Sequence, residues 1–296
     1  MSQSASSACT EFAAAKVNLT LRVGAARADG YHPVDSVVVF ADWGDELSFE
    51  PADDLQLFLS GDHAASLHGE GENLVLKAAY ALRAAAEKPE LGAHITLVKS
   101  LPVASGIGGG SADAAAALRG LNRLWDLDFS DRQLAEIATV IGADVPVCVY
   151  SRAMKMTGIG ERVAPLIAWP SLVGVLVNPG IGVSTAAVFE AFDAGKPGAL
   201  DRARAPVAGD VEAALEYLRG DRNDLEPPAH SLQPVIGQVL DQLRTLPAQR
   251  LVRMSGSGAT CFALFQEMSD AKAAAEKLRN DNPDWIVQAV TFAGAV

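Results

Sequence analysis

The sequence of 296 residues has little cysteine, and what it has does not form a recognisable pattern. There are three cysteines, an odd number, and they are widely separated without CxxC spacing: Cys9, Cys148 and Cys261. A disulfide framework and a structural zinc site are therefore not expected. The five histidines also lack HExxH or similar ligand spacing. A metal ion, if one is used, should arrive with a ligand rather than sit in a cage of protein side chains.

Long apolar runs are absent as well. No segment approaches the roughly 18 to 20 consecutive apolar residues that a membrane span needs. Residues 1–9 have neither the basic start nor the apolar stretch of a secretory signal, so we expect a frayed tail. These features favour a cytoplasmic protein with no membrane partner.

Basic residues are in the minority. Lys and Arg total 24 against 36 Asp and Glu, which gives a formal charge of −12. A chain this acidic repels a nucleic-acid backbone, so no nucleic-acid partner is expected. A phosphorylated small molecule is compatible with this charge, because a few backbone amides and one lysine overcome the global field locally. We expect a monomer or a weak homodimer.

The composition is that of a folded globular protein, with 49% apolar and 20% charged residues, and the length favours two domains. Apolar periodicity predicts a mixed α+β pattern with a boundary near residue 160, dividing 1–160 from 161–296. The predicted strands span residues 17–23, 34–40, 46–50, 55–59, 94–98, 145–150, 172–177 and 285–292. The predicted helices span residues 73–87, 111–124, 130–142, 211–218, 234–243 and 270–278, and a surface loop is expected at 193–210.

A glycine-rich segment, Pro102–Asp113, joins a predicted strand to a predicted helix. Its four glycines among residues 106–110 allow tight turns and a close approach of backbone amides to a ligand. The helix that follows adds free N–H groups and a partial positive charge. The segment is not a Walker A loop, because no Gly-Lys-Ser/Thr follows it. It is also not GxGxxG, because counting from Gly106 places Ser111 at the last glycine position. A connector without a ligand is the alternative, but the strand–loop–helix placement favours phosphate binding. The Ser111 hydroxyl could reach a phosphate oxygen or a magnesium ion.

Three segments together resemble the signatures of the GHMP kinases, a family that includes galactokinase, homoserine kinase, mevalonate kinase and phosphomevalonate kinase. Pro102–Asp113 looks like the second signature, Ser255–Ala259 the third and Ala15–Leu19 the first. Ala14 stands where the family often has proline, which would loosen the approach to Lys16. The resemblance implies ATP-dependent phosphorylation of a small molecule. It also implies a two-domain fold, with an N-terminal ribosomal-protein-S5-like α/β domain and a C-terminal α+β domain.

A finer likeness lies within that family. Lys16–Leu19 followed by Arg27–His32 resembles the branch whose acceptor is 4-diphosphocytidyl-2-C-methyl-D-erythritol. The likeness runs in order from about Lys16 to Phe265, and it includes Gly142–Pro146, Asn178–Gly180 and Asn223–Glu226. It implies transfer of the γ-phosphoryl group of ATP to the 2-hydroxyl of that acceptor, in the methylerythritol phosphate route to isoprenoid precursors. The implied partner is a small molecule that carries a cytidine diphosphate group.

The resemblance also implies the catalytic pair. Asp144 corresponds to the base that accepts the alcohol proton, and Lys16 to a cation beside it that keeps the aspartate ionised. Taken from the residues alone, Asp144 could be an ordinary turn residue between Gly142 and Pro146. Lys16 could equally be an exposed lysine at a strand start.

Two sets of binding residues follow from the same resemblance. ATP is expected to lie mainly on the first half, contacting Asn73, Pro102, Val103, Ala104, Ser105, Gly106, Ile107, Gly108, Gly109, Gly110, Ser111 and Ala112. The acceptor is expected in a cleft between the halves, contacting Asn18, Tyr31, His32, Asp144, Thr185, Phe189, Ser257 and Gly258. Tyr31 and His32 would stack on or hydrogen-bond the base, and Phe189 would be the ring on its opposite side. Mg²⁺ is implied by ATP chemistry, without a dedicated ligand set.

Plainer interpretations of these residues remain open. Asn73 could be simply the cap of a helix. Tyr31 and His32 could be ordinary turn residues, and Phe189 could belong to the core. A GHMP kinase for homoserine or mevalonate is the nearest rival function, although neither acceptor has a base to stack on those rings. A nucleotide-binding module without catalysis is a rival from another class, and ADP release with and without the cytidyl acceptor would separate the two.

Overall fold

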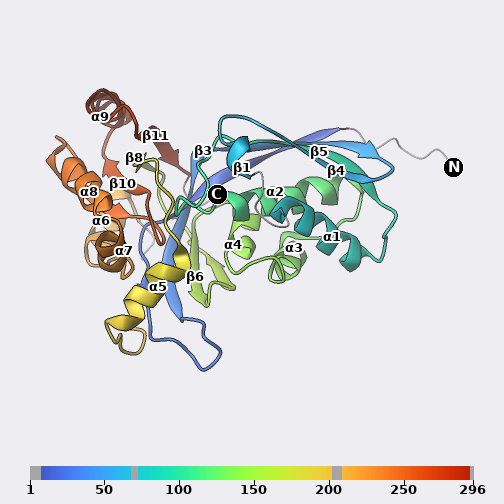
Figure 1. Ribbon diagram of the computed structural model, residues 1–296, viewed down its shortest axis with the longest axis horizontal. Helices are drawn as coiled ribbons and strands as arrows, with labels where there is room; N and C mark the ends of the chain where they lie inside the picture. Colours follow the sequence, from blue (N-terminus) through green and yellow to red (C-terminus); the bar gives the residue numbers. More distant parts are fainter. Residues whose placement is uncertain (1–7, 68–72, 202–208, 294–296) are drawn as a thin grey trace. The chain divides into compact units, whose positions relative to one another are not determined.

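The structure, a computed structural model, describes residues 8–67, 73–201 and 209–293 (Figure 1). The chain forms two compact units, each built from several segments. A single cut near residue 160 does not describe them, because Lys16–Trp43 and Ala104–Ile107 group with the C-terminal half. Binding of ATP by one half and of the acceptor between the halves stays a prediction. The expected N-terminal tail lies mostly outside the described residues.

The first unit contains a sheet in which one strand pairs with neighbours of both orientations. The strands involved are β1 (Cys9–Asn18), β3 (Val34–Ala52), β4 (Leu55–Ser60) and β5 (Gly92–Val98). β5 pairs in parallel with β4, and in antiparallel with the second half of β3, where Phe49 lies opposite Ile95. Phe49 and Ile95 are fully buried. The alternation of buried and half-exposed residues along β5 is that of a strand with one face on the core.

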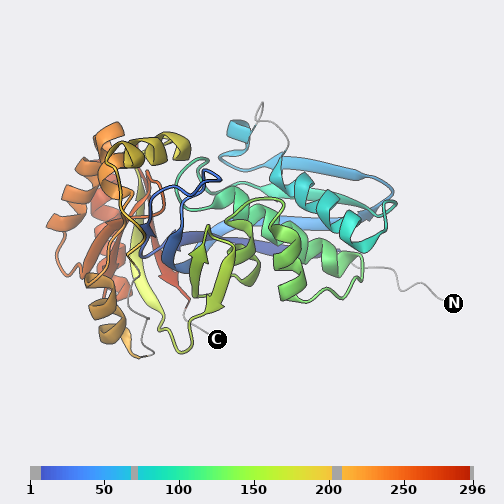
Figure 2. The ribbon, with the colours of Figure 1, turned by 90° about the horizontal axis from the view of Figure 1, so that it is seen from below.

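Helices of the first unit gather on one face of this sheet (Figures 1 and 2). They are α1 (Leu74–Ala86), α2 (Gly109–Leu124), α3 (Asp131–Ala138) and α4 (Val145–Tyr150), while the short helix η1 (Ala64–Leu67) follows β4. α2 packs against α1, α3 and α4, and its alanines are buried, which allows close helix packing. A β-carbon on Gly120 would lie 2.2 Å from the Phe49 ring, so this mid-helix glycine makes room for the sheet.

One predicted strand is wrong. Residues 145–150 form the short helix α4, with Pro146 in its first turn. A continuous apolar run has no periodicity that separates a buried strand from a buried helix, so the pattern could not decide. Val145 to Val149 are buried throughout because α4 packs against both α2 and α3. Proline is well tolerated at the start of a helix, where its missing N–H has no partner to lose.

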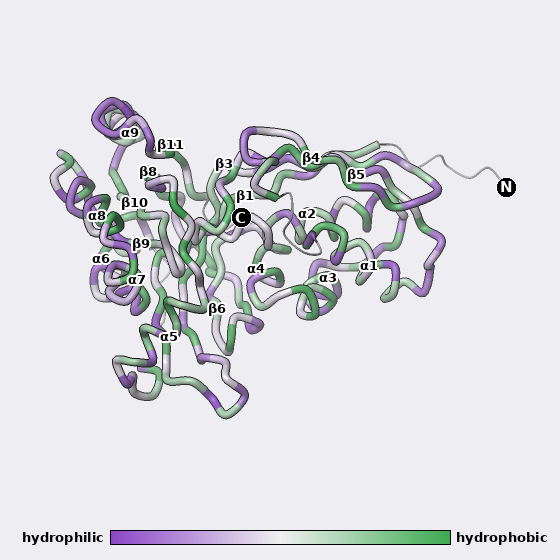
Figure 3. Tube along the Cα trace, in the orientation of Figure 1, coloured by the Kyte–Doolittle hydropathy of each residue, from purple (hydrophilic) through white to green (hydrophobic). Residues whose placement is uncertain are grey.

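The second unit contains an antiparallel sheet with β8 between two neighbours. Its strands are β8 (Leu172–Asn178), β9 (Leu251–Met254), β10 (Cys261–Phe265) and β11 (Ile286–Phe292). β8 pairs with β10 and β11, and β9 pairs with the far side of β10. β8 and β10 are almost wholly buried, and β8 carries the hydrophobic colour in Figure 3. The hairpin of β6 (Met154–Gly158) and β7 (Arg162–Pro165) joins the first half of β3, as does the short strand β2 (Arg22–Val23).

Five helices complete the described part of the second unit. They are α5 (Thr185–Ala194), α6 (Val211–Arg219), α7 (Glu226–Leu232), α8 (Val235–Thr245) and α9 (Met268–Asp281). α8 packs on β9 and β10, and α9 packs on β8 and β11. The helices predicted at 211–218, 234–243 and 270–278 are confirmed, whereas α5 and α7 were not predicted. Of the expected loop at 193–210, residues 202–208 lie outside the described part.

Several boundaries differ from the prediction. The strand expected at 17–23 is interrupted, since β1 begins at Cys9 and ends at Asn18, and β2 follows. The helix expected to end at Gly142 stops at Ala138, although the predicted capping box of Ser130 and Gln133 is present. Helix α2 starts two residues earlier than expected, at Gly109. Within the described ranges, no helix combines the length and apolar character that crossing a bilayer requires.

Candidate active site

Two glycine motifs that are far apart in the sequence touch backbone to backbone. The Thr260 amide donates to the carbonyl oxygen of Ser105 at 3.0 Å, and the Ser255 hydroxyl donates to that of Gly106 at 3.0 Å. Gly106 has φ +77°, and a β-carbon there would lie 2.6 Å from the Gly258 carbonyl oxygen. Glycine is therefore required at 106 by both backbone conformation and space.

The first turn of α2 leaves backbone donors available. Gly108 precedes the helix with φ +62° and supplies no capping side chain. The first helical hydrogen bond runs from the Ala112 amide to the Gly108 carbonyl oxygen at 2.8 Å, so the amides of Gly109, Gly110 and Ser111 have no partner within the helix. The two glycines carry no side chain over them. This arrangement suits the predicted contact with phosphate groups.

A buried ion cluster holds the chain where it enters this loop. The Lys99 ammonium contacts Asp45, and it contacts Asp113 on α2 at 2.7 Å. All three side chains are at most 4% exposed. The other oxygen of Asp45 accepts from the amides of Ser100 and Leu101. The cluster thereby ties β5, β3 and α2 together at the start of the glycine loop.

The charge of the cluster is affected by its burial. Loss of solvent raises the pKa of Asp113 to about 8, and repulsion from Asp45 adds to this, while Lys99 opposes it. Burial would lower the pKa of Lys99, but the carboxylates of Asp113 and Asp45 outweigh it and raise that pKa above its usual value. Sequence reasoning missed Lys99 and Asp45, because nothing local links a lysine to a carboxylate 54 residues away.

Lys16 and Asn18 lie side by side on β1. Lys16 is 3% exposed, unlike the surface lysine considered from the sequence, and its amide donates to the Ile107 carbonyl oxygen at 2.9 Å. The Asn18 amide donates to the Ser255 hydroxyl at 3.1 Å, and its Nδ2 donates to Ser36. Its buried Oδ1 has no hydrogen-bond partner among the described residues. A buried acceptor without a partner is uncommon in folded proteins. The contact of Asn18 with the acceptor molecule stays a prediction.

Asp144 immediately precedes α4 in the first unit. It occupies the N-cap position, but its side chain makes no cap hydrogen bond, and it is half-buried. Lys16 belongs to the second unit. The pairing of these two side chains stays a prediction.

His32, in the segment between β2 and β3, meets two phenylalanines of α5. The His32 ring lies 4.7 Å from that of Phe189, centroid to centroid, and 6.1 Å from that of Phe192. The Nε2 atom of His32 is 2.9 Å from a carboxylate oxygen of Asp193. His32 and Phe189 are in contact, so a flat base cannot enter between them.

The remaining predicted acceptor residues occupy the same unit. Tyr31 is 56% exposed, and its ring has no stacking partner in the described part of the chain. Its amide donates to Asp29, which is the turn arrangement considered from the sequence. Thr185 begins α5, and its hydroxyl lies 2.9 Å from that of Ser257. The structure thus brings Thr185, Ser257 and Gly258 to one turn.

Asn73 has the plainer of its two predicted roles. Its Oδ1 accepts from the Val75 amide at 2.9 Å, so it caps α1. Its contact with adenosine stays a prediction. The signal for a cap was already present in the sequence, since asparagine preceded an apolar-periodic segment.

Comparison with known proteins identifies the family. Residues 73–152 match the family model described as GHMP kinases N terminal domain, and residues 199–284 match GHMP kinases C terminal. A solved mevalonate kinase from L. major, in complex with R-mevalonate, has a TM-score of 0.73 at 16% identity and covers 99% of each chain, which shows the shared fold. The fold class predicted from the sequence, α+β in a two-domain GHMP kinase arrangement, is confirmed.

More similar relatives narrow the assignment. A protein of Bradyrhizobium diazoefficiens is 50% identical over 94% of this chain and 96% of its own, and one of Parvibaculum lavamentivorans is 49% identical over 96% and 98%. Both are named 4-diphosphocytidyl-2-C-methyl-D-erythritol kinase. A crystal structure of 4-(cytidine 5'-diphospho)-2C-methyl-D-erythritol kinase has a TM-score of 0.79 at 36% identity and covers 97% of this chain and all of its own. The chain belongs to the GHMP kinases and, within them, to the family of 4-diphosphocytidyl-2-C-methyl-D-erythritol kinases.

Proposed function

We propose that this chain transfers the γ-phosphoryl group of ATP to the 2-hydroxyl of 4-diphosphocytidyl-2-C-methyl-D-erythritol. The products are the 2-phosphate and ADP, in the methylerythritol phosphate route to isoprenoid precursors. The observation that carries this proposal is near-full-length identity of about one half to kinases named for this substrate. Contact between His32 and Phe189 supports it, because a base-bearing acceptor needs an aromatic surface.

The nucleotide part of the site depends on backbone groups. The amides of Gly109, Gly110 and Ser111 would donate hydrogen bonds to the phosphate oxygens, aided by the positive end of α2. Residues 102–107 lead into that turn, and Ser105 and Gly106 within them contact the third glycine motif. Mg²⁺, bound with the phosphates, would supply charge neutralisation, and the Ser111 hydroxyl is the residue positioned in sequence to share in holding it. Among the described residues, no cluster of three His, Cys, Asp or Glu offers a cage of its own.

The chemistry itself requires a base and a cation. Asp144, which stands immediately before α4, would accept the proton of the attacking hydroxyl, as the family resemblance implies. Lys16 would stabilise charge that develops during transfer. The partner-free Oδ1 of Asn18 and the hydroxyls of Thr185 and Ser257 would orient the acceptor. Tyr31 would supply an exposed ring for the base. Gly258, which has no side chain, would let the acceptor approach the backbone closely.

The test is an assay of ADP release over a small panel of alcohols. The panel contains the cytidyl diphosphate acceptor, mevalonate and homoserine, each with ATP and Mg²⁺. Release that depends on the cytidyl acceptor alone is expected. Turnover with mevalonate or homoserine would favour another GHMP kinase activity. No release of ADP with any of the acceptors would favour a nucleotide-binding module without catalysis. A monomeric or weakly dimeric state, the lack of a nucleic-acid partner and a cytoplasmic location remain predictions.

A further inference from the structure

The segment Asp221–Glu226, here called the clamp segment, contains the Asn-Asp-Leu-Glu motif that the proposed chemistry leaves unused. It connects α6 to α7 in the second unit. Its residues bind two different parts of the chain, the stretch after β1 and the end of β9. Most of these contacts involve a backbone group, so the segment fixes the path of the main chain.

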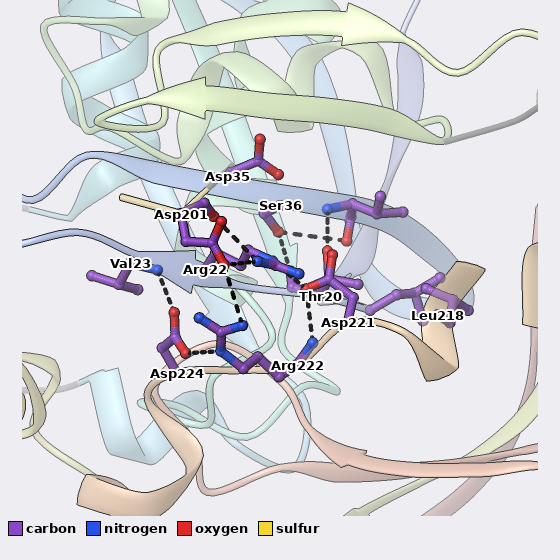
Figure 4. A network of polar contacts seen from close by, with 12 residues as sticks. Thr20, Arg22, Val23, Asp35, Ser36, Asp201, Leu218, Asp221, Arg222 and Asp224 are labelled. Atoms are coloured by element: carbon purple, nitrogen blue, oxygen red, sulfur yellow. Dashed lines mark hydrogen bonds and ion pairs between the residues drawn. The ribbon is translucent and has the colours of Figure 1, made fainter. Parts of the chain in front are cut away.

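The clamp segment first binds the stretch that follows Asn18. The Leu21 amide donates to the Arg222 carbonyl oxygen at 2.9 Å, and the Asp224 amide donates to that of Leu21 at 2.8 Å. The Asp224 carboxylate accepts from the Val23 amide at 2.9 Å. Figure 4 shows this carboxylate reaching Val23 on one side and Arg222 on the other.

Ion pairs strengthen this first attachment. Arg22 donates to Asp221 at 2.7 Å and to Asp201 at 2.7 Å (Figure 4). The Arg22 and Asp221 side chains are 11% and 3% exposed, so their pair is largely shielded from water. Arg253, on β9, donates to the carbonyl oxygens of Leu19 and Asp221. The stretch that leads from Asn18 to β2 is therefore held from two sides.

The second attachment passes through Asn223. This side chain is 5% exposed, and its Nδ2 donates to the carbonyl oxygens of Met254 and Gly256, each at 2.8 Å. Its Oδ1 accepts from the Leu225 amide at 2.9 Å. The two donated bonds use both N–H groups of the amide, and an aspartate could make only the accepted bond. Glu226 adds a bond from the Met254 amide at 2.9 Å.

Gly256 is the point at which this clamp meets the glycine motifs. A β-carbon on Gly256 would lie 2.9 Å from the Gly106 carbonyl oxygen. Ser255 bridges the Asn18 amide and that same carbonyl oxygen. Asn223 thus holds the third glycine motif through the carbonyl groups of Met254 and Gly256. The same motif contacts Gly106 through Ser255 and contains Ser257.

We infer that Asn223 is a positioning residue, which holds the turn at Ser255–Gly258 in register with the glycine loop at Gly106. The inference rests on the proposed function, because the proposed function assigns ATP to the glycine loop and the acceptor to Ser257. Asn223 touches neither ligand in this account. It acts by fixing two carbonyl groups, so that the backbone amides and the Ser257 hydroxyl face their ligands without a cost of ordering on binding.

The test replaces Asn223 by aspartate, which has the same shape but lacks the donor. The new oxygen faces two carbonyl oxygens at about the 2.8 Å distance now occupied by hydrogen bonds. The KM values for ATP and for the cytidyl acceptor should both rise about tenfold or more, as expected for loss of hydrogen bonds in a buried turn. Peptides covering residues 104–107 and 254–260 should also exchange amide hydrogen faster.

Asn122→Asp is the matched control. Asn122 likewise donates through Nδ2 to a carbonyl oxygen, that of Phe129, and accepts from the Phe129 amide, but it lies at the end of α2 in the first unit. This variant should lose thermal stability while both KM values and the exchange of the two peptides stay unchanged. Asn223→Asp protein that folds with unchanged KM values and unchanged exchange would overturn the inference.

A second variant covers the case in which Asn223→Asp does not fold. Ser255→Ala removes the bridge between Asn18 and Gly106, the next contact in the same path. It should raise the same two KM values, and normal values would count against the inference. Calorimetric binding of ADP to both variants is measured as well. If wild-type protein is inactive on the cytidyl acceptor, the proposed function fails, whereas the ADP and exchange results still decide the role of Asn223.

Discussion

The hydroxyl of Ser255 donates a 3.0 Å hydrogen bond to the carbonyl oxygen of Gly106, although 149 residues separate them. The same hydroxyl accepts from the amide of Asn18. One small side chain therefore joins the three motifs by which the family was recognised. Their order along the chain gives no hint of this meeting, which depends on the second unit gathering residues 16–43, 104–107 and 152–296.

Gly106→Ala should damage both stability and activity. The residue has φ +77°, and its β-carbon would lie 2.6 Å from a backbone oxygen, so strain and overlap add. Gly180→Ala is the control, since Gly180 has the same φ of +77° but a nearest atom at 3.2 Å. The free energy of unfolding, measured in denaturant, should fall about 1–3 kcal/mol further in the Gly106 variant. Equal losses in the two variants would show that the contact with the third motif is unimportant.

Asp144→Asn should abolish most of the turnover without preventing nucleotide binding. Loss of a general base costs about 10²- to 10⁴-fold in rate. The measurements are kcat in the ADP-release assay and the affinity for ADP by calorimetry. Asp131→Asn, an exposed change in the first turn of α3, serves as the control and should leave kcat unchanged. Near wild-type kcat in the Asp144 variant would remove this residue from the chemistry.

Phe189→Ala should weaken binding of the cytidyl acceptor selectively. Stacking of a base on an aromatic ring contributes about 1–3 kcal/mol, which corresponds to a roughly 5- to 150-fold rise in KM. The KM for ATP should not change. Phe192→Ala removes an equal volume from the same helix, and its ring lies farther from His32, so a smaller effect is expected. Equal effects of the two changes would refute a stacking role specific to Phe189.

Asp113 should make the stability of the protein fall as pH rises from about 4 to 8. In this window the unfolded carboxyl, with an ordinary pKa of 3.8, is ionised, while burial raises the folded pKa to about 8. The folded state then binds more protons, so the free energy of unfolding declines with increasing pH and this contribution levels off above pH 8. Lys99 titrates outside the window, because its raised pKa keeps it charged in both states there.

Asp113→Asn isolates that contribution. The amide keeps the shape and an acceptor for Lys99 but cannot ionise, so the decline between pH 4 and 8 should be shallower than in wild type. Denaturant unfolding at several pH values measures the difference. Parallel curves for the two proteins would mean that Asp113 does not hold its proton in the folded state.

Local patterns predicted much of the fold. Helix α1 lies within one residue of the prediction at each end, and the Ser130 capping box is present. Such features depend on neighbours three or four residues away, which the sequence shows directly. The helix at residues 145–150 was missed, because an all-apolar run carries no period and only packing against α2 and α3 decided its form.

By itself, the sequence determined the kinase family, the glycine motifs and most helices, since these are properties of adjacent residues. Tertiary structure alone decided that Ser255 would meet Gly106, that Lys99 would lie between Asp45 and Asp113, and that Asn223 would hold Met254 and Gly256. The physical reason is that a buried polar group must find a partner wherever the folded chain supplies one. Separation along the chain does not limit that choice, so no local pattern records it.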